Sequence, residues 1–267
     1  MAKPDKSSRK QDATKPAADA GASQEVAVER PAEGAWREDA VVAGSSRFTF
    51  ADKCVGIFLW IVALGLYVYT LQPNVGLEDS GEFIAASDHF GVPHPPGYPL
   101  WSLLTFLLAH VFPVGNIAWR VNLFSALCGA TAVGLFGMLM SHSVRWMLTS
   151  IRGIDLKSAS FCSVVGAVTG GLVLAFSDVM WSQAVIAEVY CLNAVFLAML
   201  LICFYKWMHD PTKTGWLVGT AFSLALGMTN HHTLLFVCPA FVGGVFLVTY
   251  FDRRLDIFRD FMVAFAL

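Results

Sequence analysis

The sequence predicts an all-α polytopic membrane protein, and two observations carry that prediction. The 267 residues are 56% hydrophobic and only 14% charged, with a mean hydropathy of +0.58, which is too apolar for an ordinary soluble domain. The apolar residues also gather in separate segments close to the length of about 20 residues that an α-helix needs to cross a bilayer. We therefore expect one transmembrane domain over residues 47–267.

The segment before this domain has a different composition. Residues 1–46 are rich in Ala, Lys, Asp, Glu, Ser and Pro, and they have no hydrophobic periodicity. Such a segment cannot bury enough apolar surface to offset the entropy that is lost on ordering. We expect a disordered tail on the cytoplasmic side of the membrane.

Six complete spans and the start of a seventh are expected. The complete spans are residues 54–71, 117–140, 159–176, 189–205, 215–229 and 233–251. Residues 257–267 read as the first half of a seventh span, and because a protein rarely ends halfway through a bilayer, we expect the sequence to be a fragment. Residues 100–112 are also apolar, but thirteen residues rise only about 20 Å as a helix. We therefore predict an interfacial or re-entrant helix there.

The Lys and Arg residues fall almost entirely on one side of this arrangement. Of the 18, all but Arg120 lie before the first span, in residues 1–53, or in one set of loops, residues 141–158, 206–214 and 252–259. The other set of loops contains no basic residue and comprises residues 72–116, 177–188 and 230–232. Because cytoplasmic loops carry an excess of Lys and Arg, we place the N-terminus in the cytoplasm and the second set of loops in the periplasm or lumen. The short loops and alanine-rich tail favour a bacterial inner membrane.

The first outer loop is the stretch around which the chain is organised. It contains four carboxylates but no cation: Glu78, Asp79, Glu82 and Asp88. Asp79 and Glu82 are three residues apart, so on a helix both carboxylates would share one face. The same spacing suits a capping box, with Asp79 as N-cap and Glu82 at N3 of a helix that runs to about Phe90. Both interpretations fix the two carboxylates in place.

A proline-rich segment follows in the same loop. Residues 92–99 contain four prolines, and proline restricts both its own φ angle and the residue before it. The segment is therefore expected to be stiff and extended, and to hold His94 and Tyr98 in fixed positions. A rigid connector without chemistry is the alternative.

Three further positions carry polar groups at membrane depth. Arg120 lies just inside the second span, where it would reach the headgroups, pair with a loop carboxylate, or hold a lipid phosphate. Glu188 lies at the edge of the fourth span, as an interface residue or as a second functional acid. Asn230, His231 and His232 form the third outer loop, where two His residues are a weak metal signal, and binding of a phosphate or of a helix end is favoured.

Four of these stretches together resemble the protein O-mannosyltransferase-like family of multispanning, GT-C glycosyltransferases. They are Asp79–Glu82, His94–Pro99, Trp119–Asn122 and Trp181–Tyr190. The resemblance covers roughly residues 50–267, and it implies a GT-C-like helix bundle with interfacial helices in its first outer loop. It also implies an enzyme that transfers a hexose, such as mannose, from a polyprenyl- or dolichyl-phosphate donor to an acceptor hydroxyl with inversion.

The resemblance also implies roles for particular residues. Asp79 would be the general base, Glu82 would orient it or the acceptor, and Glu188 would be the second acid. His94, Tyr98, Arg120, Asn230, His231 and His232 are the candidate substrate-binding residues. No metal site is assigned, although acids in separate loops could hold a divalent cation, which is the one candidate cofactor.

The expected partners are a lipid-phosphate sugar, an acceptor that is a protein, a lipid or a glycan, and the bilayer, with no nucleic acid. Two other functions stay open. A transporter or flippase of a lipid-linked or anionic solute would also use charged residues at membrane depth. A non-catalytic membrane assembly protein would keep the same loops for structural reasons.

Overall fold

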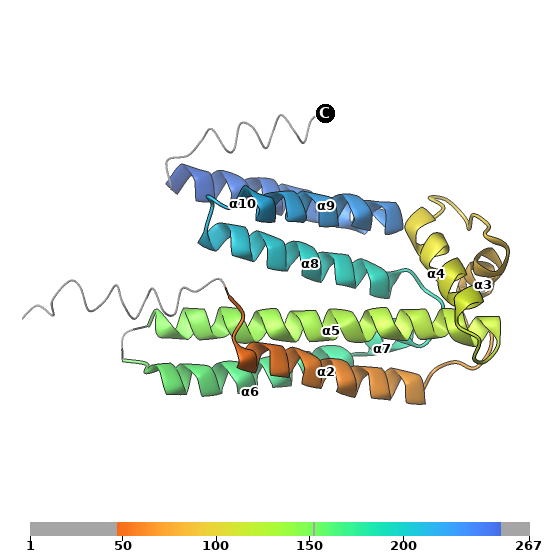
Figure 1. Ribbon diagram of the computed structural model, residues 1–267, viewed down its shortest axis with the longest axis horizontal. Coiled ribbons are helices and arrows are strands. Elements are labelled where there is room, and N and C mark those ends of the chain that lie inside the picture. Colours follow the sequence, from red (N-terminus) through yellow and green to blue (C-terminus); the bar gives the residue numbers. More distant parts are fainter. Residues whose placement is uncertain (1–46, 152, 252–267) are drawn as a thin grey trace, which may run out of the picture.

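The computed structural model describes residues 47–151 and 153–251, which form a bundle of helices lying side by side (Figure 1). The long helices are α2 (Phe50–Tyr69), α5 (Ile117–Thr149), α6 (Leu156–Ala175), α8 (Tyr190–His209), α9 (Thr214–Asn230) and α10 (Cys238–Phe251). The shorter elements are α3 (Ser80–His89), α4 (Pro99–Val111), α7 (Asp178–Ala184) and the 3-10 helix η1 (His232–Val237). Over the described ranges the chain is therefore an all-α membrane protein, as predicted.

Within residues 47–151 and 153–251, five of the six predicted spans coincide with helices that are long and apolar enough to cross a membrane. They are α2, α5, α6, α8 and the continuous pair η1–α10. The exception is α9, predicted as the fifth span, which is helical but only 17 residues long. At 1.5 Å per residue it reaches about 26 Å, somewhat less than the hydrocarbon thickness of about 30 Å. The predicted tail of residues 1–46 and the start of a seventh span lie outside the described residues.

The loops divide between the two ends of the bundle in the same groups that the charges suggested. The start of α2 and the loops after α5 and α8 lie at one end, which we call the basic end (Figure 1). Helices α3 and α4, the loop before α8 and the loop after α9 lie at the other, which we call the acidic end. The 13-residue α4 lies there at an angle to the long helices. This arrangement brings all the outer-loop candidates to one end.

Close packing of α2 against α5 fixes the centre of the bundle. A Cβ atom on Gly56 would lie 2.9 Å from the backbone oxygen of Gly134, so only glycine allows the two helices to approach this closely. Such small-residue contacts are the usual way in which helices associate in lipid. The fully buried Tyr67 donates a hydrogen bond of 2.9 Å to the carbonyl of Ala175, which ties α2 to α6. The three helices form a rigid support for the acidic end.

An ionic cluster joins α2 to α5 at the basic end. The fully buried Asp52 accepts two hydrogen bonds from the guanidinium group of Arg145, at 2.6 and 2.8 Å. It also accepts a bond of 2.7 Å from the Ser141 hydroxyl, and its Oδ2 lies 3.1 Å from Nδ1 of His142. Its carboxylate completes a capping box with Thr49 at the start of α2. One side chain therefore caps a helix and joins it to its neighbour.

The structure corrects the capping-box interpretation of the first outer loop. Asp79 does occupy the N-cap position of α3, and the helix ends at His89 as expected, but the Asp79 side chain makes no capping hydrogen bond. The Glu82 carboxylate accepts from His94 rather than from the N-cap backbone. The reason is that the proline-rich segment brings a better donor to Glu82 than the helix end offers.

Candidate active site at the acidic end

Glu82, His94 and Tyr98 form a hydrogen-bonded chain at the acidic end. Both oxygens of the Glu82 carboxylate bind His94, one at 2.6 Å from its backbone nitrogen and the other at 3.0 Å from Nδ1. The Nε2 atom of the same imidazole lies 3.0 Å from the Tyr98 hydroxyl. The two ring nitrogens of His94 therefore bridge the Glu82 carboxylate and the Tyr98 hydroxyl. The hydrogen bond between the His94 side chain and Glu82 is the main cause of the lowered pKa of the Glu82 carboxyl.

Asp79 lies on the open side of this chain. Its Oδ2 is 4.0 Å from Nε2 of His94, and its side chain is 64% exposed. It has neither a capping bond nor a cationic partner other than His94 among the described residues. Asp79 is therefore the carboxylate at this site that is most accessible to an incoming substrate hydroxyl.

A pair of stacked rings lies next to the acids. The Tyr98 and His231 rings are almost parallel, with centroids 5.8 Å apart and an interplanar angle of 4°. Tyr190 contacts the same imidazole, at 5.2 Å. Tyr98 has a φ angle of 43°. Residues other than glycine rarely adopt this backbone conformation, which costs about 1–3 kcal/mol. Burial lowers the pKa of His231, followed by the effect of His232, so the stacked ring is favoured in its neutral form.

Glu188 is buried, only 3% exposed, and its backbone is hydrogen-bonded to two elements. Its carbonyl accepts from the Trp101 indole of α4 at 3.3 Å and from the Ser125 hydroxyl of α5 at 3.2 Å, while its N–H donates to Ser125. The next carbonyl, of Val189, accepts from Asn230 at the end of α9. Asn230 thus positions the loop that carries Glu188.

Burial, and after it the carboxylates of Glu78 and Asp79, raise the pKa of Glu188 from about 4.5 to about 7, although the Val189 N–H and His94 lower it. A carboxyl group in this range exchanges a proton near neutral pH, which is what general acid–base chemistry needs. The acidic end therefore holds two kinds of acid, the exposed carboxylates of the first outer loop and a buried one that titrates near neutrality.

This difference gives a stability prediction for Glu188→Gln. Below about pH 4 the carboxyl is protonated in both the folded and the unfolded chain, so the variant and the wild type should be equally stable. As the pH rises through 4.5 the unfolded chain ionises first, and the wild type loses stability until about pH 7, by about 3 kcal/mol in all. Glu188→Gln avoids that loss. Thermal unfolding in detergent between pH 4 and pH 8 tests this, and equal midpoints at pH 8 would contradict it.

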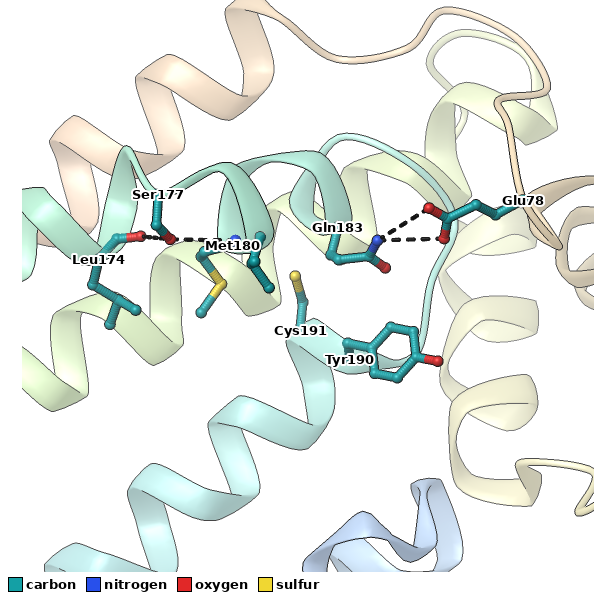
Figure 2. Close-up of a pocket in the computed structure, with 8 residues that line it drawn as sticks. Glu78, Leu174, Ser177, Met180, Gln183, Tyr190 and Cys191 are labelled. Carbon is teal, nitrogen blue, oxygen red and sulfur yellow. Dashed lines mark hydrogen bonds between the residues drawn. The ribbon is translucent and has the colours of Figure 1, made fainter.

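A cavity of about 550 Å³ opens beside the acids (Figure 2). Its wall is mainly apolar, and the lining residues come from the end of α6, from α7 and from the start of α8: Leu174, Ser177, Val179, Met180, Gln183, Tyr190 and Cys191. Glu78 closes one side, where its carboxylate accepts from the Gln183 amide at 3.3 Å. Glu78 has a φ angle of 58°, a second unusual backbone conformation at this site.

The structure does not bring Arg120 into this cluster. Its guanidinium group donates three hydrogen bonds of 2.5 to 3.0 Å to backbone carbonyls at and after the end of α4, those of Ala109, Val114 and Gly115. Each of the three guanidinium nitrogens makes one of these bonds, so the observed role of Arg120 is to order the return of the chain from α4 to α5. His232 is exposed at the start of η1. Its ring centroid lies 6.2 Å from that of the His231 ring.

Sequence reasoning missed Glu78, Gln183 and Tyr190 as members of the site. Gln183 is 105 residues from Glu78, and no local pattern links them. The available signal was the pairing of a third loop carboxylate with polar residues at the edge of the next outer loop. Within residues 47–151 and 153–251, no three His, Cys, Asp or Glu side chains converge to hold a metal ion.

Fold and site together define a multi-pass, all-α membrane protein with a cluster of acids, imidazoles and tyrosines at one end of its bundle. A family model described as the Protein O-mannosyl-transferase TMEM260 N-terminal domain matches residues 79–254. The chain belongs to this family.

Two curated relatives agree with this assignment. The mouse Protein O-mannosyl-transferase TMEM260 is 32% identical over 210 residues, which cover 77% of this chain and 26% of that protein. The *Dictyostelium discoideum* protein of the same name is 27% identical over 215 residues, covering 75% of this chain and 24% of that protein. The chain spans about a quarter of the length of these relatives. No solved structure matches the chain.

Proposed function

We propose that this chain forms the catalytic membrane part of a glycosyltransferase that moves a hexose from a lipid-phosphate donor to an acceptor hydroxyl. The observation that carries the proposal is the cluster of two motifs of the first outer loop at the acidic end, in which Glu82, His94 and Tyr98 are hydrogen-bonded and Asp79 lies 4.0 Å from His94. The names of the relatives favour mannose as the sugar and a protein hydroxyl as the acceptor.

The proposed reaction is a single displacement. The acceptor oxygen attacks the anomeric carbon, and its proton passes to the carboxylate of Asp79. The bond from the anomeric carbon to the phosphate oxygen breaks, and its electron pair stays on the lipid phosphate. One displacement inverts the configuration of the sugar. Because the lipid phosphate is a good leaving group, this scheme needs a base within hydrogen-bonding reach but no protein acid for the departing oxygen.

The surrounding residues have supporting roles in this proposal. Glu82 holds His94, and His94 holds the Tyr98 hydroxyl, so that the face next to Asp79 is pre-organised. Glu188, with its pKa of about 7, is a second group that can accept a proton near neutrality. His94 and His231 are the groups we propose to face the leaving phosphate, since Arg120 is bound to backbone carbonyls.

The apolar cavity beside Glu78 supports a donor that carries a lipid chain. Its wall of Leu174, Val179 and Met180 suits hydrocarbon, and Glu78, Gln183 and Tyr190 lie at the edge that meets the acids. A soluble nucleotide sugar has no hydrocarbon chain that such a wall could bury. We further propose that the acidic end faces the periplasm or lumen and that the basic end faces the cytoplasm, by the distribution of Lys and Arg.

The proposal is tested with membranes that contain the natural full-length protein. A radiolabelled polyprenyl-phosphate mannose and a nucleotide sugar are offered in parallel, with a serine- and threonine-containing polypeptide as acceptor. We expect label to move to the polypeptide from the lipid-linked donor alone, with inverted configuration. Transfer from the nucleotide sugar alone would reject the donor class. Movement of intact lipid-linked sugar across sealed vesicles, without transfer, would favour the transporter or flippase.

A further inference from the structure

The basic end carries a lysine that is held in place but has no acidic partner. Lys206 lies near the end of α8, and its ammonium nitrogen is 4.9 Å from the centre of the Phe48 ring and 4.5 Å from that of the Trp216 ring. Its side chain is half-buried. No Asp or Glu of residues 47–151 and 153–251 forms an ion pair with it. Two rings fix the cation, and neither neutralises it.

The nearby carboxylates are paired with other cations. Asp52 is bound by Arg145 on two sides, and Asp210 lies 2.8 Å from the ammonium group of Lys213. Lys53, in the first turn of α2, adds a further cation at the same end of the bundle. Like charges in a partly desolvated site repel one another unless an anion lies between them.

A second polar group close to this site lacks a partner. The Phe48 ring that contacts Lys206 also contacts the His142 ring of α5, with centroids 5.1 Å apart. His142 is only 2% exposed, and its Nε2 atom is buried without a hydrogen bond in the described part of the chain. Phe48 thus lies between α5 and α8, with a cation on one helix and an unsatisfied imidazole nitrogen on the other.

The site lies at the level where a membrane presents its headgroups. Lys206 is the fourth residue from the end of the candidate span Tyr190–His209, and Lys53 is the fourth residue of the candidate span Phe50–Tyr69. Trp and Lys side chains are typical of this interfacial layer, and anionic headgroups attract basic residues there by about 1 kcal/mol for each Lys or Arg.

We propose that Lys206 and Lys53 bind the phosphate group of an anionic lipid in the leaflet at the basic end, with Phe48 and Trp216 as the walls of the site. The ligand chemistry is a phosphate mono- or diester anion. The half-buried ammonium group supplies the charge, the two rings exclude water from one side of it, and the lipid chains run along the outer surface of the bundle. This site is at the opposite end of the molecule from the proposed active site, and it does not depend on the proposed reaction.

The experiment uses the purified full-length protein in detergent, with phosphatidylglycerol or phosphatidylcholine added and the bound lipid counted by native mass spectrometry. We compare the wild type with Lys206→Gln and with Lys157→Gln. Lys157 is an exposed lysine at the basic end, so its removal changes the overall charge equally. We expect the wild type to retain phosphatidylglycerol in preference to phosphatidylcholine. Lys206→Gln should weaken that retention about five-fold, and Lys157→Gln should leave it unchanged.

Further arms separate charge from folding and lipid from free anion. Lys206→Arg keeps the charge and should retain phosphatidylglycerol, whereas a loss equal to that of Lys206→Gln would overturn the proposal. Equal weakening by Lys206→Gln and Lys157→Gln, or equal retention of the two lipids by the wild type, would also overturn it. Displacement of phosphatidylglycerol by the same concentration of inorganic phosphate would assign the site to a soluble anion and overturn the lipid assignment.

Discussion

Replacing Asp79 by Asn is expected to lower hexose transfer by about 10²- to 10⁴-fold, the usual contribution of a positioned general base. Asparagine has nearly the shape of aspartate, but it cannot take a proton from the acceptor hydroxyl. The Asp79 side chain is 64% exposed and makes no capping bond at the start of α3, so the folded structure should not depend on its charge. Transfer should fall while protein abundance and thermal unfolding stay the same.

Asp88→Asn is the matched control for this variant. Asp88 also lies on α3, but its carboxylate contacts His89 at 3.4 Å and His110 at 4.0 Å, away from His94. The same chemical change at Asp88 should leave transfer intact. If Asp79→Asn transfers sugar as well as the wild type, Asp79 is not the base, and the buried carboxylate of Glu188 becomes the candidate. A fall in both variants would indicate that the net negative charge of the loop matters rather than one carboxylate.

Replacing Asp52 by Asn is expected to lower the free energy of unfolding by about 3–5 kcal/mol, the cost of removing one partner from a buried ion pair. The variant leaves the guanidinium group of Arg145 without its carboxylate, and it weakens the capping box at Thr49. The measurement is thermal or denaturant unfolding in detergent, followed by circular dichroism. Because the cluster lies at the basic end, the folded fraction should keep its transfer activity.

Asp210→Asn serves as the comparison for the ionic cluster. It breaks an ion pair with Lys213 at the same end, but that lysine is 63% exposed and solvent screens the pair, so the expected loss of stability is much smaller than for Asp52→Asn. The double variant Asp52→Asn with Arg145→Gln should recover part of the stability, since it removes the buried charge that the single change leaves unpaired. Equal losses for Asp52→Asn and Asp210→Asn would show that the buried cluster is not a major source of stability.

The helices could be predicted from the sequence, because the length of an apolar segment and the positions of the charges around it are local properties of the chain. The end of α3 at His89, the short α4 and the division of loops between two ends all follow from such patterns. The predicted span of residues 215–229 coincides with α9, a helix of 17 residues that runs from the basic end to the acidic end.

The site was only partly predictable, because its decisive contacts join residues far apart in the chain. The contact of Glu82 with His94 depends on the path of the intervening turn, where Phe90 has a φ angle of 51°. The carbonyl partners of Arg120 depend in the same way on the path after α4. The Trp101 and Ser125 contacts to Glu188 span 87 and 63 residues, and no local spacing records such contacts.

The anchoring of Glu188 separates the shape of its loop from the chemistry of its side chain. Trp101 and Ser125 hold the backbone of residue 188, and Asn230 holds that of residue 189, so none of these bonds uses the carboxylate. Substitutions that silence the acid should therefore leave a correctly shaped cavity beside Glu78. A variant of this kind is the natural starting material for trapping the donor and the acceptor together before either bond has changed.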